Sequence, residues 1–260
     1  MSPSLRLPVP FVLVTGGKGG VGKSTVAANL ALSLTREGRR VLLVDLDLGL
    51  GDLETLLALP PGPSLEEGLA GGGLEACLRQ GPGGVDVLTA ANGNEDLARG
   101  DAVMRTRLFE ALVPLASRYE LVIGDSAAGI GPDVLAFACA ADRVLVTTTP
   151  EVAALTDAYG LIKALDQYSA RTNADVPTPE LVVNQANDVA EADGIARKLR
   201  SVCERFLCRS PRQAGWLPRS AAIARGTGSG RPFALESEGL EALCLRQLGA
   251  RLGRRAVATR

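Results

Sequence analysis

The stretch FVLVTGGKGGVGKST, residues 11–25, decides the fold of this chain. It begins with a short apolar run, Phe11 to Thr15, continues through a glycine-rich loop, and leads into residues 25–37, whose apolar spacing predicts a helix. Gly17 to Ser24 satisfies the pattern G-x-x-x-x-G-K-[ST]. Because this pattern lies between a strand and a helix, it predicts a phosphate-binding loop rather than a chance glycine-rich turn.

Each residue type in this loop suits the binding of phosphate. The glycines allow successive backbone N–H groups to turn toward an anion, and the start of the helix adds a positive dipole. Lys23 is expected to reach the β and γ phosphates, and the Ser24 hydroxyl is expected to bind Mg2+. The predicted nucleotide contacts are Gly17, Gly19, Gly20, Val21, Gly22, Lys23, Ser24 and Thr25.

The same alternation of apolar strands and amphipathic helices continues along the chain. Further strands are predicted at residues 41–45, 85–89, 121–124, 144–148 and 181–183, and helices near residues 102–117, 151–169 and 191–207. This order is typical of an α/β, doubly wound, mostly parallel sheet with helices on both faces. We expect one domain over residues 1–260, with a nucleotide-binding core at 10–235 and a C-terminal helix within 236–260. The Gly-rich segment 226–230 is predicted to form a mobile loop.

Composition excludes several kinds of chemistry. The 260 residues include no histidine, so the usual general base and the commonest zinc ligand are absent. The five cysteines are scattered without a Cys-x-x-Cys pair, and we predict that they are buried thiols. The chain contains no run of about 18 apolar residues, and Met1 to Pro10 lacks the apolar core of a signal peptide. We therefore expect a cytoplasmic protein whose catalysis uses carboxylates, lysines, backbone amides and Mg2+.

Three carboxylates follow predicted strands. Asp45 and Asp47 end the strand at 41–45, and Asp125 ends the apolar run Leu121-Val-Ile-Gly. Because ligands bind at the carboxyl edge of parallel strands, these side chains are expected near the phosphate loop. Asp125 has the Walker B arrangement and is predicted to hold Mg2+ through water, and the Asp45 and Asp47 pair to orient water and the Mg2+ shell. A helix cap is the alternative role for either member of the pair.

The segment Lys18-Gly-Gly-Val-Gly-Lys-Ser-Thr25 resembles the deviant Walker A family of MinD and ParA proteins. The resemblance implies binding of ATP and Mg2+, a homodimer that forms on ATP binding, and slow, partner-stimulated ATP hydrolysis. It also implies that Lys18 crosses to the partner's nucleotide, where its positive charge stabilises the transferring phosphoryl group. A solvated loop lysine is the alternative for Lys18.

The same resemblance assigns further site residues. It implies that Asp47 positions the attacking water and that Asp45 is its partner near the metal. Gly129 corresponds to the loop that senses the γ phosphate, although Ser126-Ala-Ala128 departs from the family pattern. Asn184 is able to hydrogen-bond a purine ring, and the Asp that selects guanine is missing from Val183-Asn-Gln-Ala-Asn187. The family assigns adenine, flanked by the segment around Pro218, where a structural turn is the alternative.

Two segments are similar to the FlhG/FleN branch, which controls flagellar number and placement: Asp45 to Leu57 and Thr148 to Lys163. The resemblance implies flagellar partners, namely an FlhF-like GTPase and a basal-body or transcriptional regulator. A MinD-like regulator of division, secretion or pilus placement is an alternative. A metabolic kinase or amidoligase is disfavoured because no site for an acceptor substrate is identifiable.

The end of the chain leaves two questions open. Residues 197–260 contain 14 Arg and Lys against 4 Asp and Glu, whereas the rest of the chain contains 14 and 25. This basic region is able to face an anionic surface, either a membrane in reversible peripheral association or, in a ParA-like alternative, DNA contacted through residues 197–212. The other interpretation is that these arginines are solvated and partly paired with acidic residues of the rest of the chain. Leu240, Cys244, Leu248 and Leu252 recur every four residues. That spacing fits either an amphipathic membrane anchor or a packed core helix, and we favour the core helix.

Overall fold

The computed structural model describes residues 6–48, 50–91, 102–207 and 209–256. The strands form one eight-stranded sheet in the order β3-β4-β2-β5-β1-β6-β7-β8. β3 pairs antiparallel with β4, and the other described pairings are parallel. The bounds are β1 Phe11–Gly16, β2 Val41–Leu46, β3 Arg79–Gln80, β4 Asp86–Leu88, β5 Leu121–Ala128, β6 Arg143–Thr148, β7 Glu180–Ala186 and β8 Arg212–Pro218. The predicted doubly wound α/β fold is confirmed.

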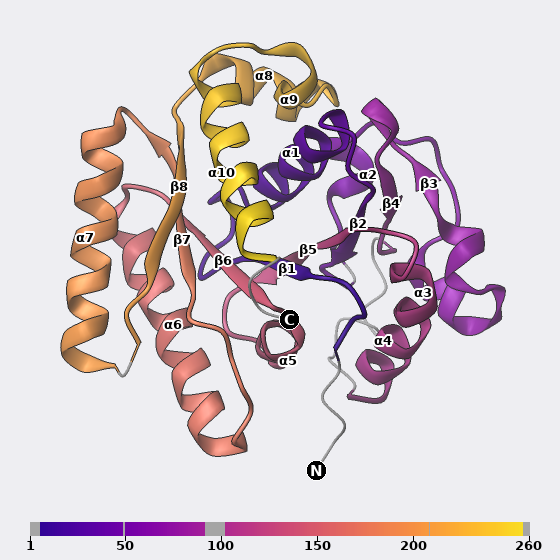
Figure 1. The fold of residues 1–260 in the computed structure, drawn as a ribbon, viewed down its shortest axis with the longest axis horizontal. Helices are drawn as coiled ribbons and strands as arrows, with labels where there is room; N and C mark the ends of the chain where they lie inside the picture. The colour runs from indigo at the N-terminus through magenta and orange to yellow at the C-terminus, as the bar shows by residue number, and fades with distance from the viewer. Residues whose placement is uncertain (1–5, 49, 92–101, 208, 257–260) are drawn as a thin grey trace.

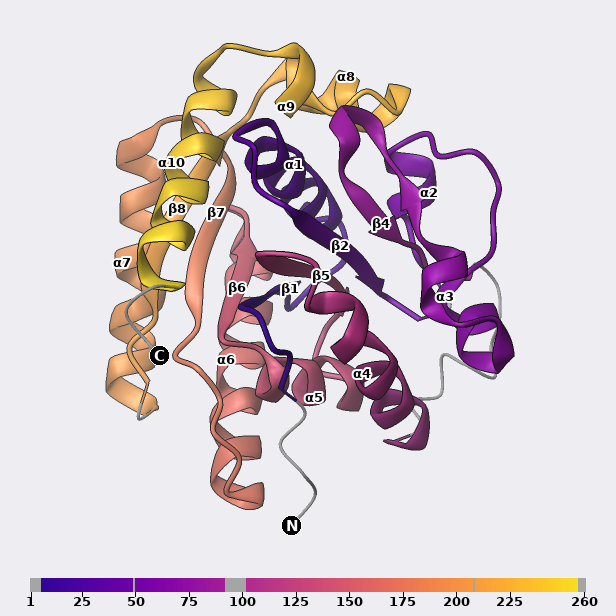
Figure 2. The ribbon, with the colours of Figure 1, turned by 45° about the vertical axis from the view of Figure 1, so that its right-hand side comes forward.

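Helices cover both faces of the sheet (Figure 1 and Figure 2). α1, α2, α9 and α10 pack on one face, and α3 to α7 pack on the other. The bounds are α1 Lys23–Arg36, α2 Leu53–Leu56, α3 Leu65–Glu67, α4 Ala102–Ala116, α5 Pro132–Ala140, α6 Val152–Thr172, α7 Val189–Phe206, α8 Ala221–Ser229, α9 Phe233–Glu236 and α10 Leu240–Ala256. Short π and 3-10 turns lie at Gly68–Gly72, Leu74–Cys77 and Pro82–Gly84.

The central strands are apolar on both sides because each face is covered. In β1, Phe11 and Leu13 point into the core under α4 to α7, whereas Val12 and Val14 point into the core under α1 and α10. This alternation follows from the two-residue period of a strand. A continuous apolar run is therefore the expected sequence of a buried parallel strand, and it is the pattern that predicted β1.

α10 is a packed core helix. Its side chains at Leu245, Leu248 and Leu252 are buried against α1 and β8. Arg251, which interrupts the apolar spacing in the sequence, donates from Nη1 to the backbone oxygen of Ala214 in β8 at 2.7 Å. The structure thus supports the core-helix interpretation of the C-terminal repeat. No helix in the described residues is long and apolar enough to cross a membrane.

The predicted mobile loop at residues 226–230 is wrong, because most of this segment belongs to α8. Gly226 is buried in that helix, where an added Cβ would come 2.7 Å from the backbone oxygen of Arg231. Gly230, with φ of 66°, ends the helix in the left-handed conformation that glycine adopts without strain. The glycines therefore mark close packing and a helix end rather than a loop.

The cysteines are free thiols where the structure describes them. Cys77, Cys203 and Cys244 are buried and Cys139 is half-buried, while residue 208 lies outside the described ranges. Burial raises the pKa of the Cys139 and Cys203 thiols to about 11. These thiols therefore remain protonated near neutral pH and lack the thiolate needed for reactivity.

Candidate nucleotide-binding site

The predicted site residues gather at one edge of the sheet. The phosphate loop follows β1, Asp45 lies near the end of β2 with Asp47 just after it, and Asp125 lies in the second half of β5. Asn184 lies in β7, two strands from β1 on the other side. Because these strands are parallel, their carboxyl ends meet at one edge, which is where ligands bind in such sheets.

The glycines of the phosphate loop are required by its backbone and by its neighbours. Gly20 and Gly22 have φ of 78° and 90°, a region that other residues rarely adopt. At Gly17, a Cβ would lie 2.1 Å from the backbone oxygen of Asp157 in α6. Gly22 caps α1 without any side-chain hydrogen bond to the helix. The first N–H groups of this 14-residue helix are therefore available to an anion.

Asn184 holds the phosphate loop. Its Nδ2 donates to the backbone oxygen of Val21 at 2.9 Å, and its Oδ1 accepts from the backbone N–H of Gln185 at 2.9 Å. The side chain is buried, and a Cβ on Gly22 would lie 2.2 Å from its Nδ2. Both polar ends of the amide are thus engaged with protein, so the described geometry shows Asn184 bracing the loop. Its predicted hydrogen bond to a purine ring stays a prediction.

Asp45 and Asp125 face each other across neighbouring strands. They are register partners in the pairing of β2 with β5, and both are buried. Asp45 accepts the backbone N–H groups of Asp47 at 3.0 Å and Leu53 at 3.4 Å. Burial and the nearby Asp125 carboxylate raise the pKa of Asp45 well above its usual value. Burial also raises the pKa of the half-buried Asp47. Removing carboxylates from water disfavours their charged forms, and proximity adds repulsion.

Asp125 has one carboxylate oxygen without a partner. Burial raises its pKa to about 7, while a hydrogen bond from the Ser24 side chain and the charge of Lys23 act in the opposite direction. Its Oδ1 is buried with no hydrogen-bond partner. In the described residues, no cluster of three acidic, Cys or His side chains is able to hold a metal alone. This donor set fits Mg2+, which takes few protein oxygens and completes its octahedron with water and phosphate.

The two lysines of the loop differ in environment. Lys23 begins α1 and is buried, near Asp47 and Asp125. Lys18 is partly exposed, and its Nζ lies 3.5 Å from Glu151 Oε2, just after β6. Sequence reasoning did not identify Glu151 as a partner of Lys18. The signal available was its position directly after a strand that ends at the same edge as β1.

Two other predicted residues lie at this edge of the sheet. Gly129 follows β5 with φ of 92°, and its N–H donates to the backbone oxygen of Gly16 at 2.9 Å. Pro218 ends β8 opposite Ala186 of β7. Gly129 therefore meets the start of the phosphate loop directly, whereas Pro218 belongs to the edge strand beyond Asn184.

The family model described as the CobQ/CobB/MinD/ParA nucleotide binding domain matches residues 12–233. The chain belongs to this family. It is 36% identical over 219 residues to the antiactivator FleN of Pseudomonas aeruginosa, a match that covers 84% of this chain and 76% of FleN. It is 34% identical to the flagellum site-determining protein YlxH of Helicobacter pylori, over 59% of this chain and 52% of YlxH.

Among solved structures, cobyrinic acid a,c-diamide synthase from Mycobacterium smegmatis with a bound ATP analog and magnesium has a TM-score of 0.73. The two chains are 26% identical, and the match covers 97% of each. The predicted membership of the MinD/ParA family is therefore confirmed, and the predicted similarity to FleN is confirmed over 219 residues. The individual roles of the site residues remain predictions from their chemistry and placement.

Proposed function

We propose that this protein is an ATP-dependent, dimerising switch ATPase of the MinD/ParA family that regulates the number or placement of flagella. The observation that carries this proposal is the juxtaposition of the phosphate loop with Asp125, whose buried Oδ1 has no hydrogen-bond partner in the described part of the chain. The 36% identity to FleN and the similarity to YlxH support the flagellar role. The whole of residues 1–260 then acts as one switch domain.

The proposed chemistry assigns a role to each polar group. The N–H groups of Gly17 to Gly22 and the Lys23 ammonium bind the phosphates, and Ser24 and Asp125 hold Mg2+. When bound, Mg2+ neutralises charge on the phosphate oxygens. Asp45, whose carboxylate accepts two backbone N–H groups, fixes the start of the loop that carries Asp47. Asp47 orients the attacking water.

A second copy of the chain completes the site. Three apolar side chains in the segments that follow β2, β5 and β6 are exposed. Leu50 and Ile130 lie in loops and Val152 begins α6, with exposed fractions of 72%, 58% and 80%. They surround the nucleotide edge, and covering them would favour association. The contact between Lys18 and Glu151 is an exposed ion pair, which costs little to break. Lys18 is therefore free to exchange Glu151 for the partner's nucleotide.

Hydrolysis measured against protein concentration tests this dimeric mechanism. The rate per chain should rise with protein concentration and reach a plateau once dimers dominate. Lys18→Ala should lower the plateau by on the order of a hundredfold, because one electrostatic contact to the transition state is lost. Lys163→Ala, at an exposed lysine of α6, is the matched control and should keep the rate. A rate per chain that is independent of concentration would contradict the mechanism.

We propose a cytoplasmic location with reversible peripheral association to anionic membranes. Attachment through α10 would require release of a helix whose residues Leu245, Leu248 and Leu252 are buried. Leu240 and Leu243 are exposed at the start of the same helix and are the apolar groups available without release. Sedimentation with anionic vesicles in Mg-ATP and in Mg-ADP tests the association. Equal sedimentation in the two nucleotides would contradict nucleotide control.

A ParA-like DNA-binding role is the second candidate, because α7 exposes Arg197, Lys198 and Arg205. Such cations would contact DNA phosphates, and affinity would fall steeply as salt increases. Retention on random duplex DNA at low salt, with ATP compared to ADP, separates the two candidates. ATP-dependent retention that disappears in Arg197→Gln with Lys198→Gln would favour DNA, and its absence would eliminate this role.

A partner protein is expected to stimulate hydrolysis. The identity to FleN supports flagellar partners, such as an FlhF-like GTPase, a basal-body component or a transcriptional regulator. The measurement is the hydrolysis rate with and without each purified candidate. A partner that binds the ATP-bound protein but leaves the rate unchanged would act as a target of the switch rather than as its activator.

A further inference from the structure

The loop between β2 and α2 carries Asp47, and Asp45 holds both of its ends. The backbone N–H of Asp47 donates to Oδ1 of Asp45 at 3.0 Å. The backbone N–H of Leu53, the first residue of α2, donates to Oδ2 of the same carboxylate at 3.4 Å. Gly51 packs against this carboxylate, because an added Cβ would lie 2.4 Å from Oδ2. The placement of Asp47 therefore depends on where α2 lies.

α2 is too short to fix its own position. It consists of the four residues Leu53–Leu56, and Asp52 at its start makes no side-chain capping hydrogen bond. A single helical turn is unstable in water, because the first turn orders several residues for few hydrogen bonds. Leu53 and Leu56 are buried, which fixes one side of the helix against the core. Tertiary contacts therefore decide where α2 lies.

Arg79 supplies a polar contact to α2 from the edge of the sheet. It lies in β3, where it is the register partner of Val87 in β4, and β3 and β4 lie beside α2 in Figure 1. Its Nη2 donates to Oε2 of Glu54 in α2 at 2.9 Å. The Arg79 side chain is only 9% exposed, and that of Glu54 is 35% exposed. This ion pair is therefore less screened by solvent than a surface pair.

The same guanidinium joins two further segments to α2. Nη1 of Arg79 donates to the backbone oxygen of Pro60, in the segment after α2, at 2.6 Å. Nη2 also donates to Oγ1 of Thr89, the residue that follows β4. Arginine suits this position because its donors form a rigid, planar fork that reaches several acceptors at once. The proposed ATPase mechanism assigns no role to this cluster, which consists of Arg79, Glu54, Pro60 and Thr89.

We propose that Arg79 is a positioning residue for ATP hydrolysis, which holds Asp47 in place through Glu54 and α2. This inference rests on the proposed function, in which Asp47 orients the attacking water. Arg79 contacts α2 and its surroundings rather than the phosphate loop. It should therefore affect the rate of hydrolysis and leave the affinity for nucleotide nearly unchanged. A small misplacement of a group that orients a reactant is sufficient to lower a rate severalfold or more.

Two variants of the full chain break the contact, one from each side. Arg79→Ala and Glu54→Ala should each lower kcat by about tenfold, measured at saturating Mg-ATP and at a protein concentration where the rate per chain has reached its plateau. The Kd for Mg-ADP, measured by calorimetry, should stay within about twofold of the parent value, since the phosphate loop is untouched. Arg79→Lys should recover part of the rate, because an ammonium pairs with Glu54 but lacks the planar fork.

Another arginine–glutamate pair provides the matched control. Arg118 lies 2.9 Å from Glu75, the same distance as in the Arg79–Glu54 pair, but its side chain is 57% exposed and lies just before β5, at the sheet edge opposite Asp47. Arg118→Ala should keep the parent kcat.

Hydrogen–deuterium exchange of the nucleotide-free chain gives a readout that does not depend on hydrolysis. Peptides that cover residues 47–53 should exchange faster in Arg79→Ala and in Glu54→Ala, because α2 is held less firmly and the N–H groups of Asp47 and Leu53 open more often. Peptides from the phosphate loop should exchange as in the parent protein. Thermal melts check folding, and Glu54→Ala changes a partly exposed side chain whose loss the fold should tolerate.

Several outcomes would overturn the proposal. They are a kcat close to the parent value in both variants, unchanged exchange at residues 47–53, or a loss of nucleotide affinity as large as the loss of kcat. A shift only in the protein concentration at which the rate reaches its plateau would assign Arg79 to the pairing of two chains instead of to Asp47. A parent protein that does not hydrolyse ATP would contradict the proposed function itself. The exchange measurement would then show, by itself, whether Arg79 holds the Asp47 loop.

Discussion

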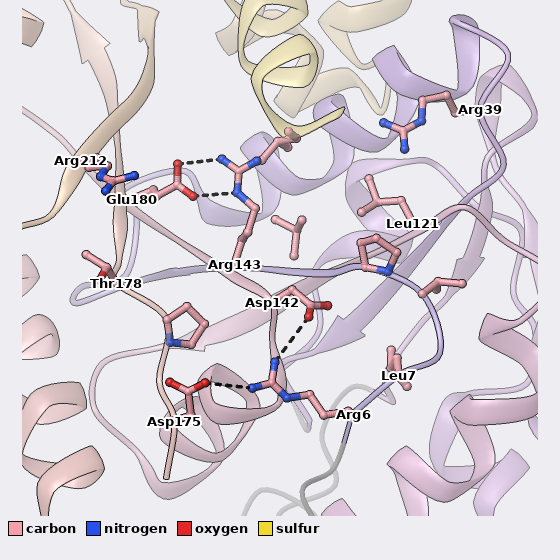
Figure 3. A pocket seen from close by; sticks show the side chains of 15 residues that line it. Arg6, Leu7, Arg39, Leu121, Asp142, Arg143, Asp175, Thr178, Glu180 and Arg212 are labelled. Carbon is pink, nitrogen blue, oxygen red and sulfur yellow. Dashed lines mark hydrogen bonds and ion pairs between the residues drawn. The ribbon is translucent and has the colours of Figure 1, made fainter. Parts of the chain in front are cut away.

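The two edges of the sheet treat buried acidic groups differently. At the nucleotide edge, Asp45 and Asp125 face each other, and Oδ1 of Asp125 has no partner among the described residues. At the opposite edge, the two carboxylate oxygens of Glu180 accept hydrogen bonds from Nε and Nη2 of Arg143, each at 2.7 Å (Figure 3). There the protein satisfies both oxygens of the buried acid itself. At the nucleotide edge Lys23 lies near Asp47 and Asp125, yet Oδ1 of Asp125 still lacks a hydrogen-bond partner among the described residues, and we propose that a ligand supplies one.

Removing Lys23, a buried cation near the nucleotide-edge acids, should have the largest effect. Lys23→Ala removes the ammonium expected to bind the phosphates, so ATP hydrolysis should fall by on the order of a hundredfold or more. Steady-state hydrolysis and binding of a fluorescent ATP analogue measure the loss. Lys163→Ala, which removes an exposed lysine of α6, is the control and should keep the parent rate. Hydrolysis by Lys23→Ala at the parent rate would break the comparison by showing that the edge does not bind phosphate.

Breaking the ion pair at the opposite edge should cost stability. Glu180→Gln leaves the Arg143 guanidinium buried without its counter-charge, and the free energy of unfolding should fall by about 3 kcal/mol. Urea denaturation of the full chain measures this change. An unchanged free energy of unfolding would show that the Arg143–Glu180 ion pair does not stabilise the fold, and the contrast with the acids at the nucleotide edge would fail.

Asp125→Asn should separate stability from ligand binding. Ligand at a hundred times its Kd stabilises the parent protein by about 2.7 kcal/mol. The variant should lose most of the part of this gain that depends on Mg2+, because an uncharged amide replaces the buried carboxylate expected to hold the metal. Without nucleotide it should be at least as stable as the parent, since a buried charge beside Asp45 is removed. Thermal melts of the parent protein and of Asp125→Asn, each with Mg-ADP, with ADP and EDTA, and without ligand, measure both effects. Equal Mg2+-dependent stabilisation would exclude Asp125 from the metal site.

The smallest effect is expected at the exposed charges of the opposite edge. Arg6 pairs with Asp142 and Asp175 at longer distances, and all three side chains are at least 38% exposed. Arg6→Gln should lower the free energy of unfolding by less than about 1 kcal/mol, as is usual for surface ion pairs. Urea denaturation of Arg6→Gln, carried out as for Glu180→Gln, shows which substitution destabilises the protein more. A loss equal to that of Glu180→Gln would show that burial does not set the difference.

The parts of the fold that sequence predicted are those with regular local patterns. β1 and β2 are continuous apolar runs, and the parallel arrangement of their strands brought Asp45 and Asp125 to one edge as expected. β8 was missed because Arg212-Gln-Ala-Gly-Trp-Leu-Pro218 mixes polar and apolar residues. That mixture suits an edge strand, which is less completely covered than the central strands.

The contacts that the sequence did not predict join residues far apart in the chain. Asn184 reaches Val21 across 163 residues, and Arg143 reaches Glu180 across 37. No periodicity or motif connects such pairs, because their proximity arises only when the sheet assembles. The glycines at 226–230 misled for a related reason. A helix that is packed closely against its neighbours requires small residues, and a glycine-rich sequence of this kind is also typical of a loop.

We propose that ATP binding at the nucleotide edge of the sheet drives the pairing of two chains. Light scattering after size-exclusion chromatography of Asp47→Ala, in Mg-ATP and in Mg-ADP, tests this most directly, because loss of the carboxylate proposed to orient the attacking water should block hydrolysis. We expect the mass of two chains in Mg-ATP and of one chain in Mg-ADP. The mass of one chain in both nucleotides, at concentrations that saturate nucleotide binding, would contradict the claim and the role proposed for Lys18.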